Sequence, residues 1–209
     1  MAENPLFKPA VPLLRSRGFK KRGGMQVFTK PLAPGINAWL GLNARSDPGR
    51  LSLSPTVGVR HELVQHWVTR LRDKDPKNDT PPTVSTGMGL LLPEGRHFPH
   101  WVLVEDEDEL NAATWELFGR DVDEHVVPWW EERSSDEAIV AALRAGQGFD
   151  TGRLALPVLL WSMGRTQEAR EAVEAGHHVR VEGGMVVDYE AYAARLLTEI
   201  DASPSGPGD

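Results

Sequence analysis

The chain has 209 residues, of which 40% are hydrophobic and 25% charged, and this balance excludes a disordered, fibrous or membrane-embedded protein. It contains no cysteine, so disulfides, thiolate metal sites and a cysteine nucleophile are excluded. A net charge of −7 opposes binding of nucleic acids or anionic membranes by the surface as a whole.

The N-terminus has no basic start followed by an apolar stretch, as a secretory signal would have. No window of the sequence approaches the roughly 20 apolar residues that a membrane helix needs. We therefore expect a cytoplasmic protein with no membrane partner.

The first half predicts one helix and then a set of strands. Apolar residues recur at helical spacing from Leu6 to Leu14, and Gly18 follows as a left-handed helix C-cap. The period then changes from 3.6 to 2, which predicts strands joined by Pro-Gly turns. The predicted strands are residues 25–30, 36–44, 51–59, 84–92 and 100–104, with turns at Pro34-Gly35 and Pro48-Gly49 and a helix at 62–72.

The second half is mostly helical, and Ser135 and Thr166 are typical N-cap residues. Gly146, Gly164 and Gly176 are typical stops. The predicted helices are residues 108–118, 122–132, 136–145, 154–163, 167–175 and 189–200, with a hairpin at 179–187.

Together these elements predict an α+β fold: an antiparallel sheet of about five strands packed with helices, followed by a mostly helical C-terminal half. We expect an α+β domain at residues 1–150 and a helical extension packed on it at 151–201. Residues 202–209 are expected to form a disordered tail.

Two segments carry resemblances to known families. The first helix ends in Gly18-Phe19-Lys20-Lys21, and with the strand meander and acidic helical segment that follow, residues 5–145 resemble a bacterial domain-of-unknown-function family with a GFKK turn. That resemblance implies an α+β domain with an antiparallel sheet and no particular activity. Residues 154–176 look like one helical hairpin of the tetratricopeptide kind, although a solenoid needs about three such repeats.

Charge is unevenly spread along the chain. Residues 1–30 hold seven basic side chains and one acidic one, whereas residues 105–137 hold thirteen acidic and two basic side chains. The run at 105–109 precedes a predicted helix, where acids favour the positive end of the macrodipole. Further acids extend the run and keep a partner-binding surface open as the other interpretation: Asp121, Asp123, Glu124, Glu131 and Glu132.

Seven tryptophans are many for this length, and indoles are enriched at interfaces. Trp39, Trp67, Trp115 and Trp161 lie on apolar stripes and are predicted core residues. Trp129 and Trp130 would point about 100° apart on a helix, so both are hard to bury on one face. An exposed indole beside Glu131 would mark a binding patch.

Sequence motifs of catalysis are incomplete. His61 and His66 are five residues apart, one too many for the zinc-hydrolase helix HExxH. His97 and His100, and His177 and His178, lack a third ligand. No phosphate loop or hydrolase elbow is complete. We predict no catalytic residues, no metal and no cofactor, and the sequence favours a protein without enzymatic activity.

Three functional hypotheses follow. The leading one is a non-catalytic interaction module, of the immunity or antitoxin type, whose acidic helical surface binds a basic protein. The alternative is a small-ligand binder or hydrolase with a site at the junction of strand and helix formed by Arg60, His61, Asn37 and Asn43. The third is nucleic-acid binding through the basic N-terminal segment, which is too narrow to favour it; its cationic residues are Arg15, Arg17, Lys20, Lys21 and Arg22.

Overall fold

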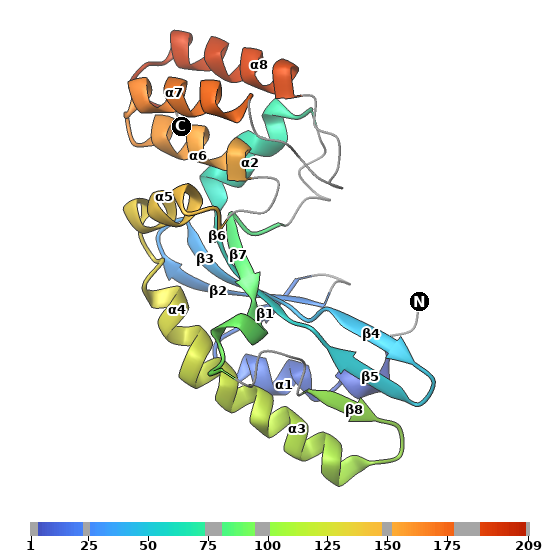
Figure 1. The fold of residues 1–209 in the computed structure, drawn as a ribbon. Helices are drawn as coiled ribbons and strands as arrows, with labels where there is room; N and C mark the ends of the chain where they lie inside the picture. The colour runs from blue at the N-terminus through green and yellow to red at the C-terminus, as the bar shows by residue number, and fades with distance from the viewer. Residues whose placement is uncertain are drawn as a thin grey trace. The chain divides into compact units, whose positions relative to one another are not determined.

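The computed structural model describes residues 4–22, 26–73, 81–94, 101–147, 152–177 and 189–207 (Figure 1). The chain forms two compact units. Unit 1 comprises Met1–Gly58 and Thr86–Glu132, and unit 2 comprises Val59–Ser85 and Arg133–Asp209. The predicted boundary near residue 150 stays a prediction, because compactness does not establish which segments fold independently.

The main sheet has five strands and is antiparallel, which confirms the predicted fold class. Its order is β1-β2-β3-β6-β7, so β1 is an edge strand. The strands are β1 (Lys20–Lys21), β2 (Val27–Ala33), β3 (Ile36–Gly41), β6 (Thr56–His61) and β7 (Val84–Gly87). The predicted turn at Pro34-Gly35 joins β2 to β3, and Gly35 has the positive φ of 72° that such a turn requires.

A second sheet has three strands in the order β4-β5-β8. These are β4 (Ala44–Asp47), β5 (Arg50–Leu53) and β8 (Val102–Val104), and the predicted turn at Pro48-Gly49 joins the first two. The prediction that residues 100–104 complete the main sheet is therefore wrong, since Val102 and Leu103 pair with β5 instead.

Three predicted strands are divided in the structure. Residues 36–44 form β3 and the first residue of β4, which belongs to the second sheet. Residues 51–59 form the end of β5 and most of β6, with a break at Ser54 and Pro55 because proline has no N–H for the ladder. Residues 84–92 form β7 and then a 3₁₀ helix, η2 (Met88–Leu91). The two glycines at positions 87 and 89 mark the change of conformation.

The helices of unit 1 other than η2 lie at its N-terminus and in the acidic segment. They are η1 (Pro5–Phe7), α1 (Ala10–Arg15), α3 (Asp108–Asp121), a π-helical turn η3 (Val122–Val126) and α4 (Val127–Glu131). Gly18 has the predicted left-handed conformation, with φ of 83°. Figure 1 shows α3 beside β8, and the Thr114 hydroxyl donates to the Val102 carbonyl at 3.3 Å.

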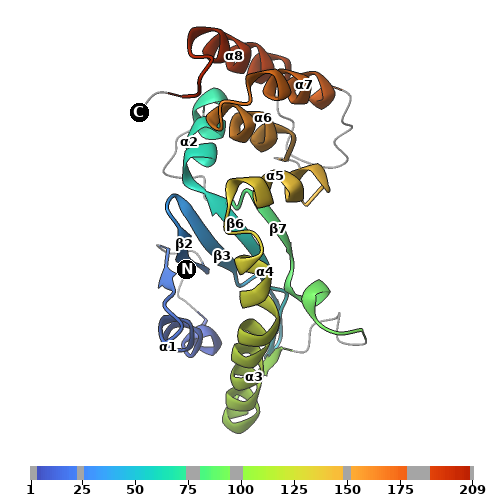
Figure 2. The same cartoon turned by 90° about the vertical axis from the view of Figure 1, so that its left-hand side faces the viewer.

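Unit 2 contains α2 (Glu62–Leu71), α5 (Asp136–Arg144), α6 (Gly152–Ser162), α7 (Thr166–Gly176) and α8 (Tyr189–Ala202). Figure 2 shows α6, α7 and α8 stacked in succession. The Tyr189 hydroxyl of α8 donates to Val173 of α7 at 2.9 Å, and Trp67 of α2 meets Trp161 of α6 edge to face. The helical hairpin predicted at 154–176 is present, while its tetratricopeptide resemblance stays a prediction.

Helix ends follow the predicted signals in part. The Ser135 hydroxyl accepts from the Ala138 N–H at 3.3 Å, which confirms it as the N-cap of α5. Gly146 and Gly164 have positive φ and follow α5 and α6 as predicted stops. Thr166, however, is the first residue of α7, and its hydroxyl donates to the Pro204 carbonyl, so the predicted N-cap role is wrong.

Three further sequence predictions concern the C-terminal tail, the hairpin at 179–187 and the absence of a membrane-spanning helix. Residues 203–207 are described: the Trp161 indole donates to the Ser203 carbonyl at 2.8 Å, and the Ser203 hydroxyl donates to Gly206 at 2.7 Å. The hairpin predicted at 179–187 lies outside the described residues. Among the helices that the structure describes, none combines the length and the apolar character needed to cross a bilayer.

Candidate functional site

The acidic run, residues 105–109, forms the turn and helix start that follow β8. All five carboxylates are exposed, and none has an ion pair or hydrogen bond with another side chain in the described part of the chain. The turn is held from inside, because Asn111 accepts from the Val104 N–H at 2.8 Å and donates to the Val104 carbonyl at 2.7 Å. Glu107 occupies the N-cap position of α3 without a side-chain capping bond.

The acids that were predicted to extend this surface fall into two groups. Glu124, Glu131 and Glu132 are exposed, and so is Asp123, which accepts two bonds from Arg17 at 2.7 and 2.9 Å. Asp121 is buried with 1% exposure and accepts from the Trp101 indole at 3.0 Å. Asp121 is therefore a core residue and contributes no surface charge.

Trp129 and Trp130 are both buried, with 7% and 2% exposure. The Trp130 indole donates to the Gly58 carbonyl at 2.8 Å and its ring lies 5.4 Å from that of Phe19. The expectation of an exposed indole here is wrong, because a helix covered on more than one side buries side chains that point 100° apart. Trp39, Trp67, Trp115 and Trp161 are buried as predicted.

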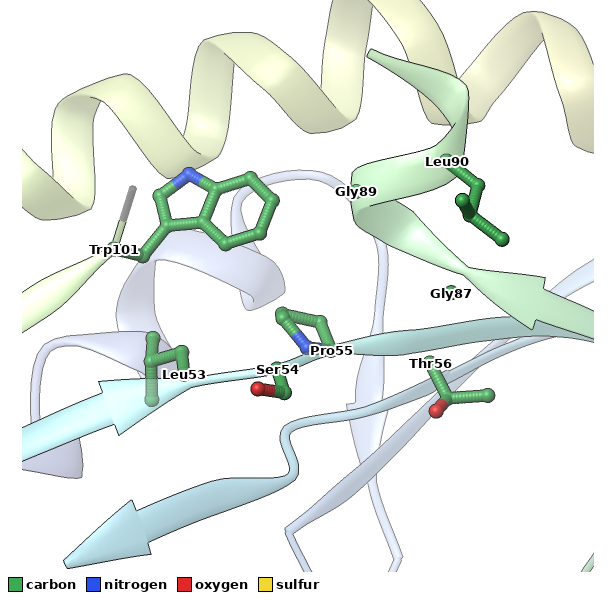
Figure 3. A pocket seen from close by; sticks show the side chains of 8 residues that line it. All are labelled: Leu53, Ser54, Pro55, Thr56, Gly87, Gly89, Leu90 and Trp101. Carbon is green, nitrogen blue, oxygen red and sulfur yellow. The ribbon is translucent and has the colours of Figure 1, made fainter. Parts of the chain in front are cut away.

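An apolar pocket of about 170 Å³ lies where β5 ends and β6 begins (Figure 3). We call it the junction pocket. In Figure 3 the Trp101 indole extends from the start of β8, with Pro55 below it and the η2 segment opposite. The lining residues are Leu53, Ser54, Pro55, Thr56, Gly87, Gly89, Leu90 and Trp101.

The break at Ser54 and Pro55 creates this pocket. Leu53 still donates to the Trp101 carbonyl at 2.9 Å, whereas Ser54 donates to Asn43 at 2.7 Å. The Pro55 carbonyl then accepts from Met88 at 2.9 Å, which anchors η2. Neighbouring backbone segments therefore diverge on the two sides of Pro55, and side chains only partly fill the space between them.

The junction pocket and the acidic run lie at the two ends of β8. Trp101 precedes the strand and Glu105 follows it, so about 13 Å of extended chain separates them at roughly 3.3 Å per residue. Each end also exposes a large apolar side chain: Leu90 is 67% exposed and Leu110 is 50% exposed. Apolar groups and unpaired charge thus occur within one short stretch of unit 1.

The predicted ligand-site residues Arg60 and His61 have structural partners. Arg60 donates to Glu62 at 3.0 Å and to the Pro81 carbonyl at 3.1 Å. Nδ1 of His61 accepts from the Val64 N–H at 3.3 Å and caps α2, while Nε2 lies 3.1 Å from Asp136 Oδ1. Because Nδ1 accepts, Nε2 carries the proton and donates to the carboxylate.

His61 is held in its neutral form. It is 7% exposed, and desolvation by burial lowers its pKa below 6.5, although Asp136 and Glu62 oppose that shift. Both ring nitrogens already have partners, and His61 does not line the junction pocket. The contacts therefore give His61 a role in holding α2 and α5.

Asn37 and Asn43 do not converge on one point. Asn37 is half-buried near the start of β3, and Asn43 follows the end of that strand, roughly 20 Å away at 3.3 Å per residue. The Asn43 amide donates to the Thr56 hydroxyl at 2.8 Å, which places it beside the junction pocket.

Metal-binding groups do not gather in the described part of the chain, where no set of three or more His, Asp or Glu side chains could hold an ion. His66 is exposed on α2, and the His177 ring lies 2.8 Å from Glu190. His97, His100 and His178 lie outside the described residues.

Sequence reasoning missed the junction pocket. Its signals were present: a proline inside the predicted strand 51–59, and glycines at 87 and 89 inside the predicted strand 84–92. Leu90 was assigned to a strand, whereas the 3₁₀ conformation turns its side chain to the surface.

Comparison with protein-family models, with curated proteins and with solved structures finds no match for this chain.

Proposed function

We propose that this protein is a non-catalytic binding module that acts in the cytoplasm and holds a basic protein partner on unit 1. The acidic run attracts basic side chains of that partner, and the junction pocket accepts one apolar side chain. An immunity or antitoxin-type neutraliser is the class of protein that this surface suits.

The observation that carries the proposal is the state of the acidic run. Its five exposed carboxylates form no ion pair with any described residue, and none of them caps α3 through a hydrogen bond. Unneutralised charge of one sign steers oppositely charged partners and raises their association rate. The exposed Leu90 and the walls of the junction pocket add the apolar anchor that interface hot spots use.

The test begins with a pull-down of the tagged protein from its host lysate at moderate salt, and mass spectrometry identifies stoichiometric partners. The purified partner is then titrated calorimetrically against the acidic variant, Glu105→Gln/Glu107→Gln/Glu109→Gln, and against Leu90→Ser. We expect each change to weaken binding by about tenfold, since the loss of three like charges lowers the association rate and the loss of an apolar anchor costs more than about 1 kcal/mol.

A matched variant controls for total charge. Glu171→Gln/Glu174→Gln/Glu190→Gln removes three exposed glutamates from α7 and α8 of unit 2 and should leave the affinity unchanged. Binding that is equally weakened in both triple variants would mean that net charge, not this surface, attracts the partner. A partner whose affinity none of the unit 1 variants alters would overturn the proposal.

A further inference from the structure

Unit 1 contains a second and larger pocket, of about 450 Å³, between α1 and the edge of the main sheet. We call it the basic pocket. Its apolar walls are Val11 of α1, Phe19 and Phe28, and its other lining side chains are Arg15, Lys20 and Lys21. Among the described residues that line it, none is acidic. In a chain of net charge −7, this is a local reversal of sign.

The end of α1 forms one side of this pocket. Gly18 takes a positive φ of 83°, and the Phe19 N–H then donates to Leu14 at 3.0 Å, which turns the chain back under the helix. Lys20 and Lys21 continue as β1, where Lys21 pairs with Phe28 of β2. β1 is an edge strand of only two residues, and within the described residues no further strand pairs with it on its other side.

The cations around the pocket are available to a ligand to different extents. Arg15 and Lys20 are exposed, and within the described residues neither side chain has an ion pair or hydrogen bond. Lys30 lies close by, with its Nζ 6.0 Å from the centre of the Phe19 ring. By contrast, Arg17 is paired with Asp123 and Arg22 donates to the Thr29 hydroxyl at 3.2 Å, and neither lines the pocket.

The C-terminal end of α1 does not offset this positive charge. Carbonyls at a helix C-terminus carry partial negative charge when they are left without donors. Here the carbonyls of Pro12, Leu14 and Arg15 accept backbone N–H groups, and the Leu13 carbonyl accepts from Ser16 and Arg17. The pocket therefore presents cationic side chains around the half-buried Val11, and the rings of Phe19 and Phe28, which are 3% and 1% exposed, form its floor.

We propose that the basic pocket binds a small ligand that joins a phosphate or carboxylate group to an apolar body. The anionic group pairs with Arg15 and Lys20, and the apolar body lies against Val11 and the aromatic walls. Guanidinium and ammonium groups form short, charge-assisted hydrogen bonds with such anions. Burial of the apolar part excludes water from those bonds and strengthens them.

The probe for this site is 1-naphthyl phosphate, measured by calorimetry and by amide chemical shifts in nuclear magnetic resonance spectra of the full chain. We expect saturable binding, shifts centred on Gly18, Phe19 and Phe28, and loss of affinity as salt is raised. 1-Naphthoate distinguishes a carboxylate ligand from a phosphate ligand. The neutral 2-naphthol lacks the anionic group, and inorganic phosphate lacks the apolar body. Each should bind about tenfold more weakly than 1-naphthyl phosphate, or weaker still.

Two charge-matched variants assign the binding to this pocket. Arg15→Gln/Lys20→Gln should weaken 1-naphthyl phosphate by about tenfold or more, because charge-assisted bonds are lost. Lys8→Gln/Arg50→Gln removes two exposed cations elsewhere in unit 1 and should have no effect. Circular dichroism checks that both variants keep the fold.

Four results would overturn the inference: no binding of either naphthyl acid, equal binding of 2-naphthol, equal losses in the two variants, or binding of a short oligothymidylate without binding of the naphthyl acids. The last result would assign the basic segment to nucleic acid.

Discussion

Two neighbouring aspartates of the acidic segment illustrate how burial separates a structural carboxylate from a surface one. Asp121 and Asp123 are equivalent in sequence, and both were predicted to bind a partner. Asp121 is 1% exposed and accepts from the buried Trp101 indole, whereas Asp123 pairs with Arg17 at the surface with its side chain 51% exposed. Only the second has a carboxylate that solvent or a partner can reach.

The two aspartates should therefore respond differently to substitution. Asp121→Ala leaves the buried Trp101 N–H without its acceptor and should lower the free energy of unfolding by about 1–3 kcal/mol. Asp123→Ala removes an exposed ion pair and should cost about 0–1 kcal/mol. Urea denaturation of both variants measures the difference, and equal losses would contradict the assignment of Asp121 to the core.

His61 couples protonation to stability, because its two nitrogens hold α2 and α5 in the neutral state. Burial lowers the pKa of His61 in the folded protein below the value of 6.5 that the unfolded chain retains. Well above pH 6.5 both states are neutral. Below it the unfolded chain takes up the proton first, so the folded state loses stability as the pH falls toward the folded pKa.

We predict that the free energy of unfolding decreases between pH 7 and pH 5, with a contribution from His61 of at most about 1.4 kcal/mol per pH unit. His61→Asn keeps an N-cap acceptor and should show a shallower pH dependence. His66→Asn, at an exposed position on the same helix, should keep the wild-type slope. Identical slopes for the wild type and His61→Asn, measured by urea titrations, would refute this coupling.

At the level of elements, periodicity predicted most helices and the existence of the sheet, but not the breaks. The alternation around Pro55 fits one strand on hydrophobic pattern alone, because apolar positions keep their period across the break. The partner of each strand depends on contacts between residues distant in sequence, so β8 was assigned to the wrong sheet. Similarly, one helix was predicted at 122–132, where the structure has a π-helical turn before Pro128.

The hairpin of α6 and α7 joins α5 through a set of ion pairs around Arg165. Arg165 lies 2.9 Å from Glu137 and 2.7 Å from Glu168, and Arg144 lies 2.6 Å from Glu168. Hydrogen bonds from Arg165, and then from Arg144, lower the pKa of Glu168 from 4.5 to about 2. The network therefore stabilises the folded state above pH 4.5 and is lost as the pH falls toward 2.

We expect Arg165→Gln to raise the pKa of Glu168 toward 4.5, since the first of its two charged donors is removed. Arg170→Gln is the control, because Arg170 lies on α7 as Glu168 does but pairs with Asp201. Carbon-detected resonance titrations of the side-chain carboxylates report each pKa directly. An unchanged Glu168 titration in Arg165→Gln would show that the network does not form in solution.

For the molecule as a whole, the sequence predicted the exposed acidic run at residues 105–109 but not the junction pocket that we propose as the apolar anchor. Runs of like charge near helix starts are exposed because burial of unpaired charge is costly, so the acidic run could be predicted from its residues. Whether Trp129 or Leu90 is exposed depends on what packs against it, and the pattern along one element does not contain that information. The apolar anchor that we propose is therefore the junction pocket and not Trp129 or Trp130.

The affinity at the two proposed sites could be controlled by the net charge of the chain or by the local charges at each site, and the two cases predict opposite effects of substitution. The acidic variant removes three negative charges and Arg15→Gln/Lys20→Gln removes two positive ones, from a chain of net charge −7. If the summed field controlled binding, the acidic variant would gain affinity for 1-naphthyl phosphate and the basic variant would gain affinity for the basic partner. Because the Debye length is about 8 Å at physiological salt, we expect local charges to dominate and each variant to lose only its own ligand. Calorimetric titration of both variants with both ligands measures this, and a gain of affinity at the opposite site, persisting at physiological salt, would show that the proposed sites are not the determinants of binding.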